Sequence, residues 1–303
     1  LVGKSDVIPV IRRIMADHLS PVLAYRRLVA SDDRTAPSFL FESVENGNEV
    51  GRFSFLGSDP SLEIVAYEHD VIIRDLVQGT EEKTTYKNPL DFLKEKSNQW
   101  NVAPPIAMGD LPLPSFTGGW VGYAGYDTAR FKELDSLPFG AAPTDDRNLP
   151  DIHMALYRTV VVFDHVAKIA HVIHNSMPDS GDVEEAWNAA NEELDRVVSM
   201  LQKEGENIPV GTVDMDLGTP PSKPTNSTMT QEEFESAVVQ CKEYIEAGDA
   251  FQIVLSQRFE HRSIVDPFEV YRTLRVVNPS PYMIYLQAEG CILAASSPEI
   301  LCR

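Results

Sequence analysis

The stretch GDAFQIVLSQRF, residues 248–259, marks the point where the chain passes from a helix to a strand. Before it, Thr230 and Glu233 have the spacing of a capping box, in which each side chain satisfies a free backbone N–H at a helix start. Apolar residues then recur at helical spacing up to Gly248, which ends a helix readily because glycine adopts positive φ without steric cost. Along residues 251–258 apolar and polar side chains alternate, which predicts a half-exposed antiparallel strand.

The residues that follow predict a helix and then a hairpin. Asp266 and Pro267 are typical of a helix start, and the prolines of NPSP, residues 278–281, end that helix. Residues 282–287 and 291–296 read as two strands joined through a short turn. Residues 297–299 resemble the start of another element, yet Arg303 closes the sequence there. Since the sequence also opens on Leu1 rather than methionine, we expect it to be a fragment.

At the N-terminal end, residues 7–15 form a short amphipathic segment at helical spacing, and residues 21–30 read as a strand. Residues 38–44, SFLFESV, predict a strand that turns through 45–48 and returns over 52–56 as a hairpin. On the residues alone, Ser43 is a small residue at a strand end and Glu42 a solvated charge.

The middle of the chain predicts further hairpins with helices between them. Strands are expected over 62–67, 71–76, 116–127, 152–163 and 168–174, and helices over 89–96, capped by Asn88, and over 182–203. The glycine-rich 116–127 lacks a following lysine and the strand-loop-helix order, so we interpret it as closely packed backbone rather than a phosphate loop. His171 and His174 lie on opposite faces of their strand and cannot chelate one metal ion. Residues 205–229, rich in Gly, Pro, Ser and Thr, predict a linker.

Composition excludes several classes of protein. The net charge is −20, with 26 basic against 46 acidic residues, which disfavours nucleic acid and anionic membranes as partners. No apolar run approaches the roughly 20 residues that a membrane span requires. The three cysteines are widely spaced and form no CxxC pair, so neither a disulfide framework nor a zinc site is expected.

Three motifs near the C-terminal end resemble one enzyme family. GDAFQIVLSQRF, NPSPYMIYL (278–286) and SSPEIL (296–301) are similar to the large subunit of anthranilate synthase, a chorismate-utilising enzyme, and the resemblance extends from about residue 20 to the end. It implies that ammonia adds to chorismate and that pyruvate is then eliminated to leave anthranilate. It also implies Mg2+ as cofactor and a glutamine amidotransferase small subunit as partner. Because the family's catalytic and metal-binding residues lie beyond these motifs, no catalytic residue and no metal ligand is assigned in this chain.

The resemblance further implies a tryptophan-binding feedback site. The segment FES, 41–43, matches the LLES motif of that site, which assigns Ser43 and Glu42 to the polar groups of the amino acid, and Phe41 replaces the usual leucine. From the second motif come Pro281, Tyr282 and Met283, whose apolar side chains would line an indole. On the residues alone, 281–283 form a rigid turn that enters a strand, with Met283 in the core.

Taken together, these patterns predict an α+β fold of layered antiparallel β-sheets with flanking helices, similar to anthranilate synthase component I, with an incomplete second domain. The expected domains are an N-terminal regulatory domain over 1–204, a linker over 205–229 and the start of a chorismate-binding catalytic domain over 230–303. Two alternatives stay open: a module that only binds tryptophan, and the related aminodeoxychorismate synthase, which generally lacks the Tyr-Met pair. We expect the plastid stroma in a plant or alga, and otherwise the cytoplasm.

Overall fold

The computed structural model describes residues 5–30, 33–43, 51–103, 114–177, 183–203, 208, 211 and 223–300. The chain divides into two compact units, one formed by residues 1–211 and 267–303 and the other by residues 212–266. The predicted turn at 45–48 and most of the predicted linker at 205–229 lie outside the described residues. The first unit carries the features of interest.

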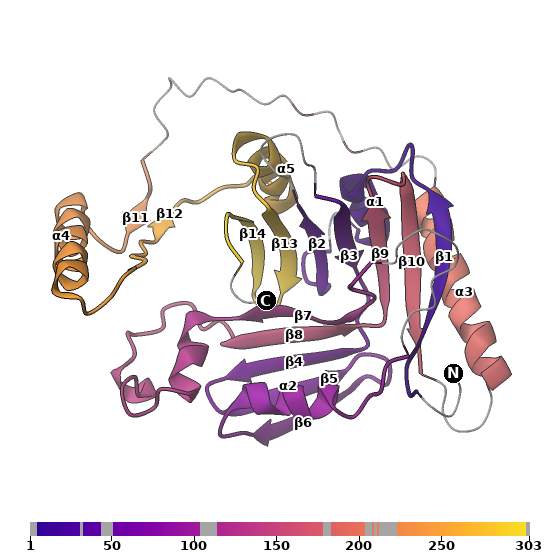
Figure 1. Cartoon of the computed structure of the whole chain (residues 1–303), viewed down its shortest axis with the longest axis horizontal. Helices are drawn as coiled ribbons and strands as arrows, with labels where there is room; N and C mark the ends of the chain where they lie inside the picture. Colours follow the sequence, from indigo (N-terminus) through magenta and orange to yellow (C-terminus); the bar gives the residue numbers. More distant parts are fainter. Residues whose placement is uncertain are drawn as a thin grey trace. The chain divides into compact units, whose positions relative to one another are not determined.

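A seven-stranded antiparallel sheet is the centre of the first unit (Figure 1). Its strands, in spatial order, are β1 (Ile8–Met15), β10 (Ile169–Ser176), β9 (Thr159–Asp164), β3 (Phe53–Gly57), β2 (Ser38–Glu42), β13 (Tyr282–Ala288) and β14 (Cys291–Ser297). The pairing of β13 with β2 joins residues more than two hundred positions apart in the sequence. The predicted division into domains at 205–229 stays a prediction, and the structure adds that the hairpin β13–β14 packs with the N-terminal strands.

Three helices cover one face of this sheet: α1 (Pro21–Leu28), α3 (Val183–Gln202) and α5 (Pro267–Val277). Each buries an apolar stripe against the strands, and aromatic rings dominate the contact between α1, α5 and β13. The ring centroids of Tyr25 and Phe268 lie 5.1 Å apart, and Phe268 and Tyr285 meet edge to face at 5.0 Å. Burial of such large rings is the main stabilising term in a core of this kind.

A second sheet packs on the other face of the first, and its strands cross those of the first sheet (Figure 1). Its five strands, in spatial order, are β6 (Thr80–Thr85), β5 (Asp70–Asp75), β4 (Leu62–Tyr67), β8 (Ile152–Tyr157) and β7 (Gly119–Ala124). Helix α2 (Pro89–Ser97), capped by Asn88 as predicted, packs through Phe92 into the core of this sheet. Two short 3-10 helices, η1 (Tyr126–Phe131) and η2 (Phe139–Ala141), follow β7.

The glycine-rich 116–127 segment confirms the expectation of closely packed backbone. Gly122 on β7 lies so close to β8 that a Cβ there would overlap the carbonyl oxygen of His153. Gly118 and Gly119 have φ of 127° and 135°, a region that side chains rarely adopt. The four glycines of this stretch therefore serve sheet packing and chain direction.

The second unit contains helix α4 (Gln231–Ala247) and a two-stranded ribbon of β11 (Asn226–Ser227) and β12 (Phe259–Glu260). The predicted helix start is confirmed, because Glu233 N donates to Thr230 Oγ1 at 3.2 Å and Thr230 N donates to Glu233 Oε2 at 2.8 Å. Gly248 ends the helix with φ of 85°, also as predicted. The strand expected over 251–258 is absent from this described segment, and pairing begins only at residues 259–260, which form β12. Alternating side chains do not keep a segment in a strand unless its backbone groups find a partner strand.

Three other predicted elements are wrong. Residues 8–15 form strand β1 rather than a helical segment, because their backbone pairs with β10 along its whole length and Val and Ile favour strands. Residues 21–28 form helix α1 rather than a strand, since Ser20 Oγ accepts the Leu23 N–H and proline occupies the first turn. The single strand expected over 152–163 is two strands, which break at Arg158 as the chain passes from the five-stranded to the seven-stranded sheet.

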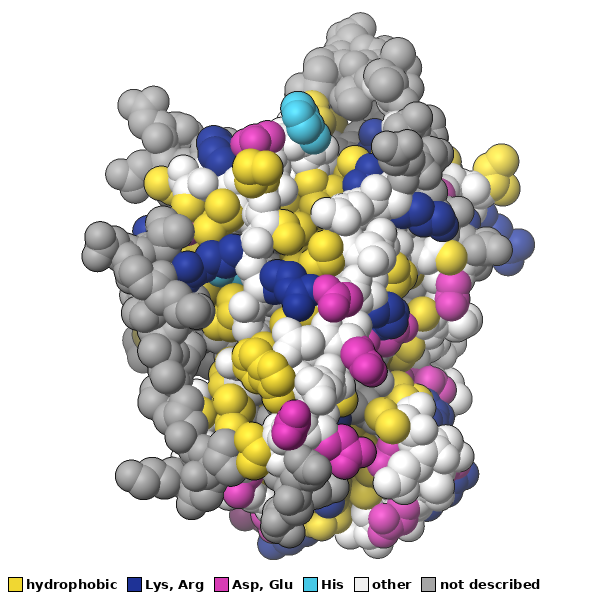
Figure 2. Space-filling model, turned by 90° about the vertical axis from the view of Figure 1, so that its right-hand side faces the viewer, with side chains coloured by type: hydrophobic (Ala, Val, Ile, Leu, Met, Phe, Trp, Pro, Cys, Tyr) yellow, Lys and Arg dark blue, Asp and Glu magenta, His cyan; other side chains and the backbone are white. Residues whose placement is uncertain are grey.

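The fold class is confirmed as α+β, with antiparallel sheets layered between helices. Figure 2 shows one face of the molecule, where basic and acidic side chains alternate with scattered apolar ones. Within the part of the chain that the structure describes, no helix is long and apolar enough to cross a membrane.

Candidate ligand site at one end of the seven-stranded sheet

The two predicted halves of the tryptophan site meet at one end of the seven-stranded sheet. Met283 on β13 lies opposite Glu42 on β2, and Phe41 lies opposite Phe55 on β3. Phe53 in turn lies opposite Asp164 on β9. The antiparallel registers therefore bring the end of β2, the start of β3, the end of β9 and the start of β13 to the same edge of the sheet.

Glu42 is buried, with 6% of its surface exposed, rather than solvated. The Tyr271 hydroxyl donates to its Oε2 at 2.7 Å, and Arg275 Nη2 donates to its Oε1 at 3.1 Å. Arg275 Nε also lies 2.7 Å from Oε2. The carboxylate is thus engaged by two side chains of α5.

Ser43 directly follows β2 and is half-buried. Gly51, on the returning segment, lies so close to Ser43 that a Cβ at residue 51 would overlap the serine side chain. Ser43 therefore faces the start of β3, which confirms the contact expected from the hairpin pattern. Small residues are therefore required at both positions 43 and 51.

Residues 281–283 do not share one environment. Pro281 is half-buried, 39% of Tyr282 is exposed, and Met283 is completely buried among the helix-side core residues. Because neighbouring side chains on a strand point to opposite faces, Tyr282 and Met283 cannot line one common surface. Of the five residues assigned to the tryptophan site, Ser43, Pro281 and Tyr282 are accessible at this edge, whereas Glu42 and Met283 lie in the core.

Arg52, His165 and their partners add polar groups to the same edge, and the sequence patterns did not single out His165. Arg52 Nη2 donates to Asp164 Oδ2 at 2.8 Å, and its guanidinium lies 5.1 Å from the centroid of the Phe53 ring. His165 Nε2 and Ser54 Oγ are hydrogen-bonded at 2.7 Å. Burial lowers the pKa of His165. The positive charges of Lys168 and Arg275 also lower this pKa, whereas the negative charges of Glu42 and Asp164 raise it without reversing the shift. The imidazole is therefore neutral at pH 7.

A cavity of about 370 Å3 lies beside these residues. It is lined by Ala16, Asp17, Leu19, Phe163, Asp164, His165 and Lys168. The pKa of Asp164 is lowered although burial opposes this, because Arg52 and the backbone N–H groups of Val166 and Ala167 donate to its carboxylate. The lining combines apolar side chains with charges of both signs, and it includes none of the five residues assigned to the tryptophan site.

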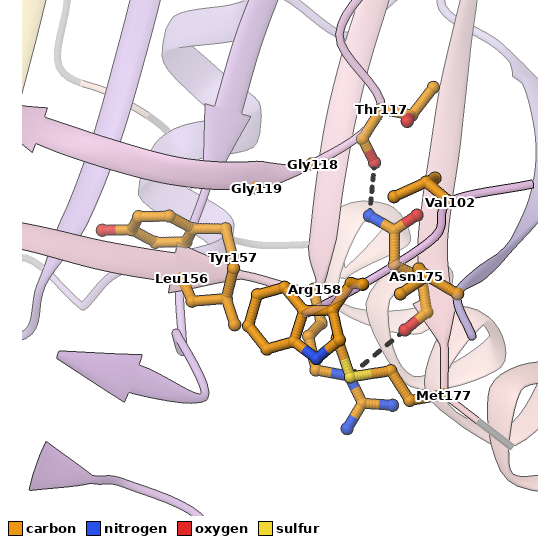
Figure 3. A pocket seen from close by; sticks show the side chains of 11 residues that line it. Val102, Thr117, Gly118, Gly119, Leu156, Tyr157, Arg158, Asn175 and Met177 are labelled. Atoms are coloured by element: carbon orange, nitrogen blue, oxygen red, sulfur yellow. Dashed lines mark hydrogen bonds between the residues drawn. The ribbon is translucent and has the colours of Figure 1, made fainter. Parts of the chain in front are cut away.

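Two other polar features of the first unit are structural. Glu63 and His153 are buried on neighbouring strands, with Glu63 Oε1 3.1 Å from His153 Nε2, and Arg74 joins Glu63 to Glu289 in the turn of the β13–β14 hairpin. Figure 3 shows a second cavity, of about 70 Å3, where Asn175 Nδ2 donates to the Thr117 carbonyl oxygen at 2.8 Å. That volume is large enough for water but too small for an amino acid.

Metal binding finds no support among the described residues. No group of three or more His, Cys, Asp or Glu side chains there is placed to hold an ion. His171 is fully buried, whereas His174 is partly exposed and bonds Thr159. The two side chains lie on opposite faces of β10.

Comparison with known proteins places the chain in a family. A model of the chorismate binding enzyme family matches residues 36–303. Anthranilate synthase alpha subunit 1, chloroplastic, from Oryza sativa subsp. indica is 51% identical over 305 residues, covering 98% of this chain and 52% of the relative. The corresponding protein of Arabidopsis thaliana is 51% identical over 304 residues, covering 99% of this chain and 51% of the relative.

A solved structure agrees with these relatives. Anthranilate synthase component I from Streptococcus pneumoniae TIGR4 superposes with a TM-score of 0.50 at 29% identity, over 90% of this chain and 54% of that chain. The chain belongs to the chorismate-binding enzyme family. It spans about half the length of the curated relatives that it matches.

Proposed function

We propose that this chain is part of the large subunit of anthranilate synthase, which converts chorismate and ammonia to anthranilate and pyruvate in tryptophan biosynthesis. The observation that carries the proposal is the 51% identity to plant alpha subunits over 98% of the chain. The three motifs at 248–259, 278–286 and 296–301 lie within the matched family region. The tyrosine-methionine pair at 282–283 favours this enzyme over aminodeoxychorismate synthase.

The proposal includes the cofactor and partners that the family implies. Enzymes of this family are generally Mg2+-dependent, and a bound Mg2+ would neutralise a substrate carboxylate. Since no metal cluster is found in the described part of the chain, we assign no ligand here. A glutamine amidotransferase small subunit would supply ammonia. The chloroplastic names of the plant relatives support a plastid location.

We further propose that the sheet edge around Ser43 is the tryptophan feedback site, with residues 1–204 as its regulatory domain and 205–229 as a linker. The register that sets β13 beside β2 supports this, because it brings both motifs of the site together. Ser43 would bind a polar group of the amino acid, while Pro281 and the exposed ring of Tyr282 would contact the indole. Tryptophan bound between these segments would bias their arrangement, which is a route to inhibition.

The first test is a thermal melt of the chain with and without L-tryptophan, with L-tyrosine as the control ligand. At 100 times its dissociation constant, a ligand of the native state adds about 2.7 kcal/mol, which at about 2.1 cal/mol/K per residue is a shift of about 4 °C for a chain of this size. We expect a shift with tryptophan alone, and Ser43→Ala should abolish it. A cooperative melt that tryptophan leaves unchanged would reject the feedback site in this chain.

The enzyme assignment is tested separately on the full-length subunit. With chorismate, ammonium and Mg2+, it should form anthranilate, which is measured by its fluorescence. Formation of 4-amino-4-deoxychorismate in place of anthranilate would reject the assignment in favour of the alternative. Because the assay measures product formation without added tryptophan, its outcome does not depend on the tryptophan site.

A further inference from the structure

Glu42 is the residue for which the resemblance and the geometry disagree. The feedback motif implies contact with the polar groups of tryptophan, whereas in the structure both carboxylate oxygens are already occupied by α5. An ammonium group that reached Glu42 would have to displace Arg275 from a buried carboxylate. Only 6% of Glu42 is exposed and its partner Tyr271 is completely buried, so a ligand has little access to this carboxylate.

We propose that Glu42 is a positioning residue of the tryptophan feedback site. Through Tyr271 and Arg275 it holds α5 against β2, the strand that Ser43 directly follows. This inference rests on the tryptophan site proposed above and changes the role of one of its residues. Tyr271 and Arg275 are four positions apart and therefore lie on one face of α5. The carboxylate joins this face to the last residue of β2.

Tyr271 is well suited to a permanent contact. Its side chain is completely buried, and the ring lies 5.6 Å from that of Tyr285 and 6.0 Å from that of Phe268. Burial raises the pKa of the Tyr271 hydroxyl, and the negative charge of Glu42 raises it further. The hydroxyl therefore stays protonated and donates to Glu42 at physiological pH.

The helix end connects this contact to the second half of the site. Asn278 N donates to the Leu274 carbonyl oxygen at 2.9 Å, so α5 leads directly into residues 278–281. Ser296 Oγ donates to the Asn278 carbonyl oxygen at 2.7 Å, and Ser280 Oγ donates to the Tyr282 carbonyl oxygen at 3.2 Å. Through α5, Glu42 thus fixes the position of Pro281 and Tyr282 relative to Ser43.

The test compares Glu42→Gln and Tyr271→Phe with a matched control in the full chain. Tyr25→Phe is that control, because Tyr25 is also fully buried in this core and its hydroxyl bonds Ser38 Oγ at 2.8 Å without reaching Glu42. The readouts are the melting temperature without ligand and the dissociation constant for L-tryptophan by calorimetry. All three variants should lower the melting temperature, which a structural role alone explains.

Only the tryptophan affinity separates positioning from structure. We expect Glu42→Gln and Tyr271→Phe to weaken tryptophan binding by roughly tenfold, within the usual range of coupling between sites, and Tyr25→Phe to leave it unchanged. Loss of binding in Glu42→Gln with full affinity in Tyr271→Phe would mean that Glu42 contacts the ligand, and would overturn the proposal. Equal weakening in Tyr25→Phe would overturn it too, as general loosening of the core.

A separate outcome identifies failure of the site itself. If the unmodified chain binds no tryptophan, the proposed feedback site is wrong, and a double-mutant cycle of Glu42→Gln and Tyr271→Phe on the unfolding free energy decides whether the contact holds α5. A clear coupling energy would retain the contact between α5 and β2. Additive effects of the two substitutions would overturn that contact as well.

Discussion

Met283 lies directly opposite Glu42 across the antiparallel pair of β13 and β2. Both side chains lie on the helix-covered side of the sheet, where Met283 joins the apolar core and Glu42 bonds α5. This single register step brings together segments from the two ends of the chain. It also explains why Ser43 and Tyr282, next to these residues in sequence, stay accessible at the sheet edge.

The neighbours Tyr282 and Met283 should respond in opposite ways to truncation. Met283→Ala removes a fully buried side chain and should lower the unfolding free energy by about 2–5 kcal/mol. Tyr282→Ala removes a ring that is 39% exposed, so it should cost much less stability but abolish the melting shift with tryptophan. Urea unfolding and ligand melts measure the two effects. Equal losses of stability in the two variants would show that the side chains of Tyr282 and Met283 both belong to the core.

Gly122 is predicted to tolerate no side chain. Gly122→Ala places a Cβ against the His153 carbonyl oxygen and should destabilise the chain by about 1–3 kcal/mol, the usual cost of overpacking. The matched control is Gly140→Ala, because no atom lies within 4 Å of a Cβ at that position. Melting temperatures of the two variants check the prediction. A Gly122 variant as stable as its control would mean that β7 and β8 can separate at no cost.

The partly buried charge bridge between the two sheets gives a third prediction. Arg74 Nη1 lies 2.8 Å from Glu63 Oε2 and 2.9 Å from Glu289 Oε2, and the Glu289 backbone N–H donates to His153 Nδ1 at 2.6 Å. Arg74→Met keeps most of the aliphatic stem but leaves Glu63 buried with only His153 as a partner. It should destabilise the chain by about 3 kcal/mol or more, as removal of one member of a buried pair does.

The control for that bridge is Glu81→Gln. Glu81 also bonds Arg74, at 3.0 Å from Nε, but its side chain is 45% exposed, so its loss should change stability much less than the loss of Arg74 does. Urea unfolding of both variants is the measurement. If the two variants lose similar amounts of stability, the contact of Arg74 with the buried Glu63 does not carry the effect.

The sequence predicts much of this fold, and the errors have physical reasons. Alternation and turn chemistry located the hairpins of β4 with β5 and of β13 with β14, and cap residues located α2, α4 and α5. The segments 8–15 and 21–28 were predicted in the wrong state, because apolar spacing over so short a range fits a strand as well as a helix. Pairing with β10 decided the first case, and the Ser20 cap with proline in the first turn decided the second.

The site was predictable only in part for a similar reason. The motifs predict Ser43 and Tyr282 as ligand-binding residues, which stays a prediction, but the burial of Glu42 depends on α5, which comes more than two hundred residues later. No local pattern carries that information, and Glu42 was therefore interpreted as a solvated or ligand-binding charge. His165 likewise enters the site only through the register of β9 with β3.

Acid should weaken the fold through His174. Burial lowers the pKa of His174 to about 4, and the positive charge of Arg158 adds to this against Glu193. In the unfolded chain a histidine titrates near pH 6.5, so between about pH 6.5 and 4 the unfolded state binds the extra proton. Stability is therefore complete above pH 6.5 and falls as the pH drops toward 4, by at most about 3 kcal/mol from this residue.

The test is the unfolding free energy of His174→Asn between pH 4 and 7.5. Asparagine retains a group that can bond Thr159 Oγ1, which His174 Nδ1 contacts at 2.8 Å, but it does not titrate. Its profile should be flatter than that of the unmodified chain, with a remaining slope because burial also lowers the pKa of His165 and His171. A profile of His174→Asn that parallels the unmodified chain would show that His174 is already protonated in the folded state or solvated there.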